Sequence, residues 1–111
     1  MARLNYVELP VTEIAVAKRF YEHVFGWALT DFGPTYASTT TGDTDIGLQG
    51  DAREATAAPL AVIDVADLEA ALAAVREAGG AVTVPIFAFP GGRRFQFTDP
   101  SGNELAVMQQ G

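Results

Sequence analysis

Two similar segments, about half a chain apart, constrain the fold of this sequence more than any other feature. An apolar stripe with three- and four-residue spacing begins at Val11-Thr12-Glu13-Ile14 and ends at Phe25-Gly26-Trp27. A second stripe begins at Val65-Ala66-Asp67-Leu68 and ends at Ala78-Gly79-Gly80. This spacing predicts an amphipathic helix in each segment. Because 111 residues suffice for one domain only, we expect both copies to belong to a single domain, residues 1–111.

Both predicted helices have capping residues at their ends. Thr12 is placed to cap the first helix, and Gly26 can adopt the left-handed conformation that ends it. Asp67 and Gly79 hold the same positions around the second helix. The residues expected to face the core are Ile14, Ala17, Phe20, Tyr21, Val24 and Phe25 in the first helix, and Leu68, Ala71, Leu72, Val75 and Ala78 in the second.

Alternating segments separated by turn residues predict four strands around each helix. They lie near residues 4–11, 27–31, 35–40 and 45–50 in the first half, and near 60–65, 81–87, 93–98 and 104–109 in the second. The order is therefore βαβββ twice, with a linker between the halves. We expect an α+β fold in which two βαβββ modules, residues 1–52 and 58–111, form a cup-shaped mixed sheet with the helices on its outer face.

Strand side chains alternate between the two faces of a sheet, which predicts what lines the cup. The apolar row of the first strand, Val7, Leu9 and Val11, is expected under the helix. The same parity leaves the other row of each strand for the cup. The predicted lining is Tyr6, Glu8, Leu60, Val62, Asp64, Glu104, Ala106 and Met108. Apolar surface with a few polar groups is typical of a small-molecule pocket.

Parity also separates two neighbouring arginines. Arg94 shares a face with Gln96 and Thr98, whereas Arg93 shares one with Phe95 and Phe97. An inward Arg94 could orient a carboxylate or enolate of a ligand, or neutralise nearby acidic groups. The alternative is a surface position or an internal ion pair.

The three acidic residues of the predicted lining, Glu8, Asp64 and Glu104, could converge. Three carboxylates could hold a hard cation or bind an amine, and Glu8 is the candidate general base because its face is otherwise apolar. The alternative is that all three line a hydrated cup mouth and bind water or backbone groups.

Three groups of residues together resemble the vicinal oxygen chelate superfamily. They are Val11-Thr12-Glu13-Ile14 with Phe20-Tyr21-Glu22 and Phe25-Gly26-Trp27, the similar segment Val65-Ala66-Asp67-Leu68 with Gly79-Gly80, and the turn Asp99-Pro100-Ser101-Gly102-Asn103. This superfamily includes glyoxalase, the bleomycin resistance proteins and the extradiol dioxygenases. The resemblance covers nearly the whole chain and is greatest to single-domain glyoxalase-like proteins of bacteria. It implies paired modules that form a cup, and commonly a homodimer.

The resemblance also implies a divalent metal ion held by His, Glu or Gln, and here the sequence departs from it. The three ligand positions of the superfamily fall on Tyr6, Leu60 and Ala106, and Leu and Ala have no donor atom. The single histidine, His23, lies on the polar side of the first helix, and cysteine is absent. We therefore expect no metal and no other cofactor, the alternative being a divalent metal bound by the carboxylates.

Charge excludes several classes of partner. Fourteen acidic and seven basic residues give a net charge of −7, which repels nucleic acid and anionic membrane surfaces.

No apolar run approaches the roughly 20 residues of a membrane span, and no secretion leader is evident, so the cytoplasm is expected.

The function predicted from these features is binding of a small, partly apolar compound, which could be cationic, in the manner of the bleomycin resistance branch. The alternative is a glyoxalase-like lyase or isomerase that uses an oxygen-ligand metal site or Glu8 as general base. A third hypothesis is a module that serves dimerisation only.

Overall fold

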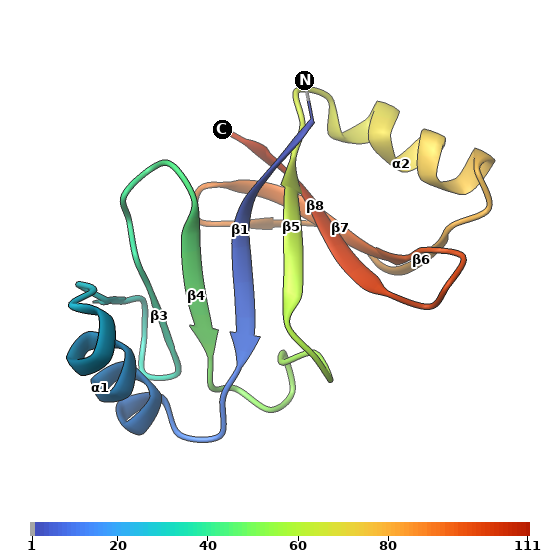
Figure 1. The fold of residues 1–111 in the computed structure, drawn as a ribbon. Coiled ribbons are helices and arrows are strands. Elements are labelled where there is room, and N and C mark those ends of the chain that lie inside the picture. The colour runs from blue at the N-terminus through green and yellow to red at the C-terminus, as the bar shows by residue number, and fades with distance from the viewer. Residues whose placement is uncertain (1) are drawn as a thin grey trace. The chain divides into compact units, whose positions relative to one another are not determined.

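The computed structural model describes residues 2–111 as two compact units (Figure 1). The N-terminal unit comprises Tyr6–Leu60, and the C-terminal unit comprises residues 61–111 together with the start of the chain up to Asn5. The order of elements along the chain is βαβββ twice, with two helices and eight strands. The predicted α+β class and the repeated module are therefore confirmed.

The N-terminal unit contains one helix and a mixed sheet with the order β2-β3-β4-β1. Its elements are β1 (Arg3–Pro10), α1 (Ile14–Phe25), β2 (Thr30–Asp31), β3 (Tyr36–Ser38) and β4 (Asp45–Gln49). Strands β1 and β4 are parallel, and the other pairs are antiparallel. The helix-facing side of the sheet holds a core of Leu29, Ala37 and Leu48, against which Leu9 and Ile14 pack.

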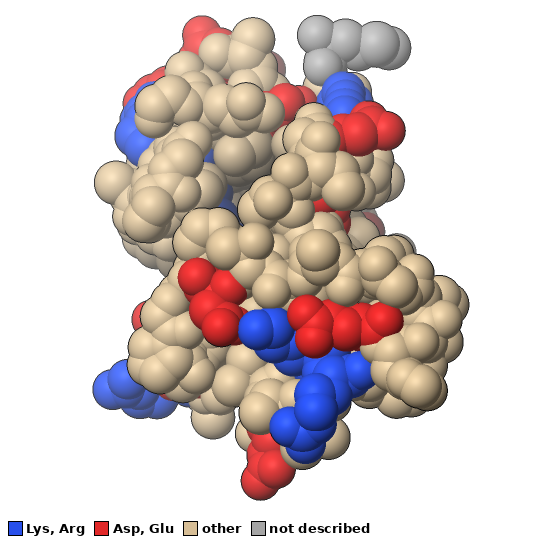
Figure 2. All heavy atoms as spheres, turned by 90° about the vertical axis from the view of Figure 1, so that its left-hand side faces the viewer, with Lys and Arg blue, Asp and Glu red and all other residues tan. Residues whose placement is uncertain are grey.

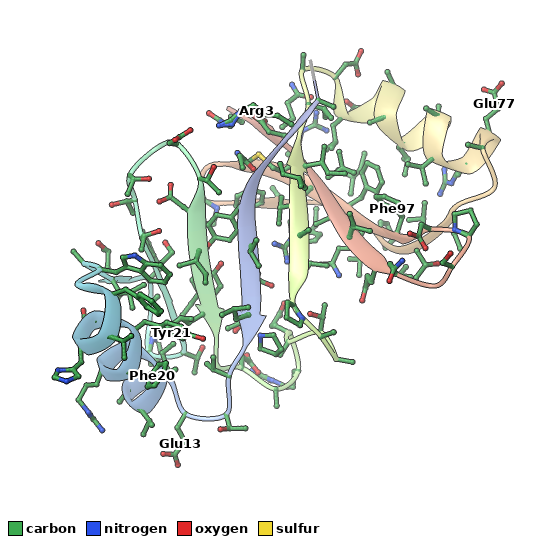
Figure 3. The ribbon with its side chains drawn as sticks, in the orientation of Figure 1. Arg3, Glu13, Phe20, Tyr21, Glu77 and Phe97 are labelled. Carbon is green, nitrogen blue, oxygen red and sulfur yellow. The ribbon has the colours of Figure 1, made fainter. Side chains whose placement is uncertain are left out.

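The C-terminal unit repeats this plan with the strand order β5-β8-β7-β6. Its elements are β5 (Leu60–Asp64), α2 (Leu68–Glu77), β6 (Ala81–Phe89), β7 (Gly92–Thr98) and β8 (Glu104–Gln110). Strands β5 and β8 are parallel, and β8-β7 and β7-β6 are antiparallel. Its core is formed by Leu68, Phe95 and Val107, and Phe97 packs against this core on the side of α2 (Figure 3).

Helix ends agree only partly with the sequence predictions. Gly26 ends α1 in the left-handed conformation, with φ of 70°, and Asp67 caps α2 by accepting a hydrogen bond from the backbone N–H of Ala70 at 3.0 Å. The prediction of Thr12 as N-cap is wrong, because Glu13 holds that position and makes no side-chain capping bond.

The predicted core face of α1 is also too wide. Ile14, Ala17 and Tyr21 pack against the core, but Phe20, Val24 and Phe25 are exposed. The physical reason lies in the sheet: β2 and β3 have only two and three residues, so they offer the helix a narrow surface. Within residues 2–111, neither helix has the length and apolar content needed to cross a membrane.

Candidate functional site

Three polar side chains meet on the face of the N-terminal sheet that is turned away from α1. Tyr6 and Glu8 are alternate residues of β1, and Tyr36 comes from β3, with β4 between the two strands. The Tyr36 hydroxyl donates a hydrogen bond to Oε1 of Glu8 at 3.0 Å, and the Tyr6 and Tyr36 hydroxyls lie 2.5 Å apart. Because Tyr36 has one proton and gives it to Glu8, Tyr6 donates to Tyr36. We call Tyr6, Tyr36 and Glu8 the tyrosine–glutamate triad.

Gly47 of β4 makes the meeting of the two hydroxyls possible. It pairs with Glu8 of β1 and with Ser38 of β3, so it lies in the middle of the sheet under the triad. A Cβ atom at this position would overlap both tyrosine hydroxyls and would lie 2.7 Å from Cζ of Tyr6. The triad therefore depends on the missing side chain of Gly47.

Burial fixes the protonation of Tyr36. Burial and then the neighbouring Glu8 carboxylate raise the pKa of Tyr36 far above the ordinary value for tyrosine, so it remains a proton donor across the physiological range. Glu8 is itself only 3% exposed. The Glu8 carboxylate is therefore a buried hydrogen-bond acceptor, and the Tyr36 hydroxyl is its donor.

A second polar network lies on the face of the C-terminal sheet turned away from α2. Arg94 donates from Nη2 to Oε1 of Gln96 at 3.1 Å, and Gln96 donates from Nε2 to Oε2 of Glu104 at 3.0 Å. The same Glu104 oxygen accepts a hydrogen bond from the Thr83 hydroxyl at 2.7 Å. The Arg94 guanidinium also lies over the ring of Phe87, 5.2 Å from its centroid, in a cation–π contact. Arg93, on the opposite face, forms an ion pair with Glu69 of α2 at 2.6 Å.

The other candidate residues of the C-terminal sheet share the face of this network. Val62 pairs with Ala106 and Asp64 pairs with Met108, while Leu105 and Val107 alternate with them toward α2. Val62 and Ala106 are buried, as is Leu60 at the start of β5. Asp64 accepts a hydrogen bond from Nε2 of Gln110 at 3.3 Å. The N-terminal candidates Tyr6 and Glu8 belong to the other unit.

The three candidate carboxylates each have hydrogen-bond donors within their own unit. These are Tyr36 for Glu8, Gln110 for Asp64, and Gln96 with Thr83 for Glu104. Among residues 2–111, no group of three or more His, Cys, Asp or Glu side chains could hold a metal ion. The donors present, a phenol already engaged by another phenol and isolated carboxylates, do not fit the set of His, Glu or Gln ligands that the sequence resemblance implied.

Sequence reasoning missed Tyr36, Gly47, Gln96 and Thr83 as members of these networks. Gln96 follows from parity once Arg94 is chosen, because the two are alternate residues of β7. Tyr36 and Gly47 depend on the registers of β4 with β1 and of β3 with β4, which no local pattern specifies.

Comparison with known proteins identifies the family. The profile of the Glyoxalase/Bleomycin resistance protein/Dioxygenase superfamily matches residues 3–107. CFP32 of Mycobacterium bovis, a provisionally named glyoxylase, is 32% identical over 95% of this chain and 44% of its own length. The chain therefore spans less than half of this curated relative.

Solved structures show the same fold at low identity. A superfamily member from Vibrio splendidus 12B01 has a TM-score of 0.72 at 20% identity, with 99% of each chain covered. The Mn(II)-bound glyoxalase of Novosphingobium aromaticivorans has a TM-score of 0.72 at 21% identity, covering 98% of this chain and 40% of that one. An extradiol ring-cleaving dioxygenase from B. fuscum has a TM-score of 0.74 at 19% identity, covering 97% and 32%. From its sequence profile and its fold, the chain belongs to the glyoxalase/bleomycin resistance protein/dioxygenase superfamily.

Proposed function

We propose that this chain binds a small organic molecule without the divalent metal ion of the superfamily's enzymes. The observation that carries the proposal is the chemistry of Tyr6, Leu60 and Ala106, the three positions at which the sequence resemblance implies the superfamily's metal ligands. Leu60 and Ala106 have no donor atom, and the Tyr6 hydroxyl is committed to Tyr36. A metal ion at Tyr6 would have to break the triad.

The ligand we propose is partly apolar and cationic. The buried side chains of Val62 and Ala106 and the half-buried Met108 make the surroundings of Asp64 and Glu104 on this face apolar. The net charge of −7 favours cations at longer range. Arg94 would then hold Gln96 in the orientation that donates to Glu104.

The triad supports a second candidate, an acid–base enzyme in which Glu8 is the general base. Tyr36 would hold the carboxylate in place through its hydrogen bond, Tyr6 would hold Tyr36, and Glu8 would accept the proton that the substrate gives up. The glyoxylase name of the curated relatives makes a lyase or isomerase the class to assay. An oxygen-ligand metal site is the weaker variant, because Glu8, Asp64 and Glu104 each have donors of their own.

A thermal-shift screen with matched ligand pairs tests the binding proposal. Each pair consists of an arylalkyl amine and the neutral alcohol of the same shape. A ligand that binds only the folded chain must raise the melting temperature, by an increment that grows with concentration over Kd. We expect the amines to give the larger shifts, and Glu104→Gln to remove the difference between amine and alcohol. Equal shifts for both members of every pair would contradict the cationic preference, and no shift with any compound would contradict binding.

Turnover assays separate the enzyme candidate. A hemithioacetal substrate that the wild type converts and Glu8→Ala does not would favour Glu8 as general base. Conversion that survives Glu8→Ala would exclude that role. We place either function in the cytoplasm, where a chain without cysteine is at no disadvantage.

A further inference from the structure

Ser38 of β3 is an exception among the buried polar side chains. Among residues 2–111, four polar or charged residues are buried, with exposed fractions of 3% to 8%: Glu8, Ser38, Thr39 and Gln96. Glu8, Thr39 and Gln96 each form side-chain hydrogen bonds within the chain. The Ser38 hydroxyl forms none with any residue of this range. Because buried polar groups are almost always hydrogen-bonded, Ser38 offers an unused group to a molecule from outside the chain.

The Ser38 side chain lies on the same face of the N-terminal sheet as the tyrosine–glutamate triad. Ala37 is fully buried in the core on the α1 side, so Tyr36 and Ser38 point to the opposite face. Ser38 pairs with Gly47 of β4, which itself pairs with Glu8 of β1. Adjacent strands are about 4.8 Å apart, so about 10 Å separates the backbones of Ser38 and Glu8. Only the tyrosine hydroxyls of the triad occupy the space above Gly47.

The Ser38 hydroxyl is buried but not sealed from solvent. Its Oγ is not one of the fully enclosed side-chain atoms that lack a hydrogen bond within residues 2–111. On its other side, Ser38 pairs with Thr30 of β2, which is exposed. Along β3, the ring of Tyr36 stands beside Ser38 on the same face. A small molecule that reaches Ser38 therefore meets one hydroxyl and one aromatic ring.

The charges of the N-terminal unit favour a neutral group at Ser38. The basic residues of Tyr6–Leu60 are Lys18, Arg19 and Arg53. The first two belong to α1, on the other side of the sheet, and Arg53 binds Asp51 at 3.1 Å. In Figure 2, which views the molecule from the α1 side, basic side chains adjoin acidic ones. An anionic group at Ser38 would thus lack a counter-charge from this unit.

Burial disfavours a cationic group at the same position. An ammonium group would lose hydration beside a residue that is only 6% exposed, and serine would return a single neutral acceptor. A neutral hydroxyl avoids that cost, and the serine hydroxyl can both donate to it and accept from it.

We propose that Ser38 is a ligand-binding residue that hydrogen-bonds a neutral hydroxyl group of a small, partly apolar molecule. The Tyr36 ring would pack against the apolar part of that molecule. The proposal rests on the small-molecule binding proposed above, and it adds the polar group that the N-terminal unit selects. The cationic preference concerns Asp64 and Glu104 of the C-terminal unit, so the two proposals are tested separately.

Titration of the ¹⁵N-labelled full chain with benzyl alcohol, benzylamine and benzoate tests the proposal by NMR. The three probes share one ring and differ in charge. We expect benzyl alcohol to shift the amide signals of Ser38 and Thr30 until they saturate, and benzoate to leave them in place. Ser38→Ala should weaken benzyl alcohol binding about two- to tenfold, as expected for one hydrogen bond. The matched control, Thr30→Val, removes the exposed hydroxyl opposite Ser38 and should leave the affinity unchanged.

Melting temperatures of the unliganded variants separate ligand binding from a structural role. Ser38→Ala should leave the melting temperature unchanged or raise it, since a hydroxyl without a partner is removed. The matched control is Thr39→Val, because the adjacent Thr39 hydroxyl donates to Asp45 at 2.7 Å and accepts from the backbone N–H of Ile46 at 3.1 Å. Thr39→Val should lower the melting temperature. Equal losses in the two variants would overturn the proposal.

The NMR outcomes also distinguish this proposal from the binding function on which it rests. Absence of shifts at Ser38, or benzyl alcohol binding that Ser38→Ala leaves unchanged, would overturn the role of Ser38. Shifts of Asp64 and Glu104 with benzylamine would then still support the binding function. If none of the three compounds shifts any signal, both proposals fail.

Discussion

Substitution of Gly47 by alanine probes the tyrosine–glutamate triad most sharply. The new methyl group would occupy the space in which the Tyr6 and Tyr36 hydroxyls meet, with Cζ of Tyr6 only 2.7 Å away. Both rings therefore have to move, and the hydrogen bond from Tyr36 to the buried Glu8 carboxylate is lost or lengthened. The φ angle of Gly47 is not in the left-handed region, so the substitution acts through space rather than through backbone strain.

The expected cost follows from three contributions. Overpacking in a well-packed region costs about 1–3 kcal/mol, and weakening a hydrogen bond to a buried carboxylate costs about 1.5–3 kcal/mol. The smaller conformational freedom of alanine in the unfolded chain offsets about 0.4–1 kcal/mol. We expect Gly47→Ala to lower the free energy of unfolding by about 2–5 kcal/mol.

A double-mutant cycle tests the cause. Urea unfolding followed by the fluorescence of Trp27, the single tryptophan, gives the free energy for each variant. If the hydroxyls cause the clash, Gly47→Ala should cost at least about 1 kcal/mol less in a Tyr6→Phe/Tyr36→Phe background than in the wild type. A wild-type stability for Gly47→Ala, or the same cost in both backgrounds, would refute the geometry of the triad.

Three further predictions concern pH and packing. Above pH 10 the free energy of unfolding of the wild type should fall more steeply with pH than that of Tyr36→Phe, by about 1.4 kcal/mol per pH unit. The reason is that Tyr36 keeps its proton in the folded chain and releases it in the unfolded chain. Urea unfolding between about pH 9 and 11.5 measures both slopes. Burial alone would raise the pKa of Asp45, but hydrogen bonds from Thr39, Thr41 and Gly42 outweigh it and lower that pKa. Ionised Asp45 thus stabilises the folded chain above the ordinary pKa of aspartate, and this contribution is lost as the pH falls through the lower pKa of Asp45 in the folded chain. Lowering the pH should therefore reduce the free energy of unfolding of the wild type more than that of Asp45→Asn. Leu48→Ala should cost about 2–5 kcal/mol in chemical denaturation, because Leu48 is fully buried in the N-terminal core, and a cost below about 1 kcal/mol would contradict that packing.

Local signals were sufficient to predict most of the elements. Asp67 and Gly26 mark helix ends through interactions within a few residues, and the structure places both as expected. Strand parity separated Arg93 from Arg94, and the two arginines do bind on opposite faces of the sheet, to Glu69 and to Gln96. These features depend on alternation along one strand, which the sequence displays directly.

Features that depend on register between strands could not be predicted. Tyr36 and Glu8 are 28 residues apart and meet because β3 and β1 each pair with β4 in a particular alignment. Hydrophobic periodicity gives the face of a side chain but not its partner across the sheet. The exposure of Phe20 has a related origin, because the stripe of α1 predicts an apolar face but not how much sheet lies beneath it.

Metal content is the direct test of the central claim, that the superfamily's ligand positions no longer hold an ion. The measurement is elemental analysis of dialysed, untagged protein, with melting temperatures recorded before and after addition of Mn²⁺, Ni²⁺ and Zn²⁺. The Mn(II)-bound glyoxalase of Novosphingobium aromaticivorans serves as the positive control. An ion bound to the folded state at 100-fold excess over its Kd would stabilise the chain by about 2.7 kcal/mol. We predict only trace metal and unchanged melting temperatures, whereas one tightly held ion per chain would contradict the account.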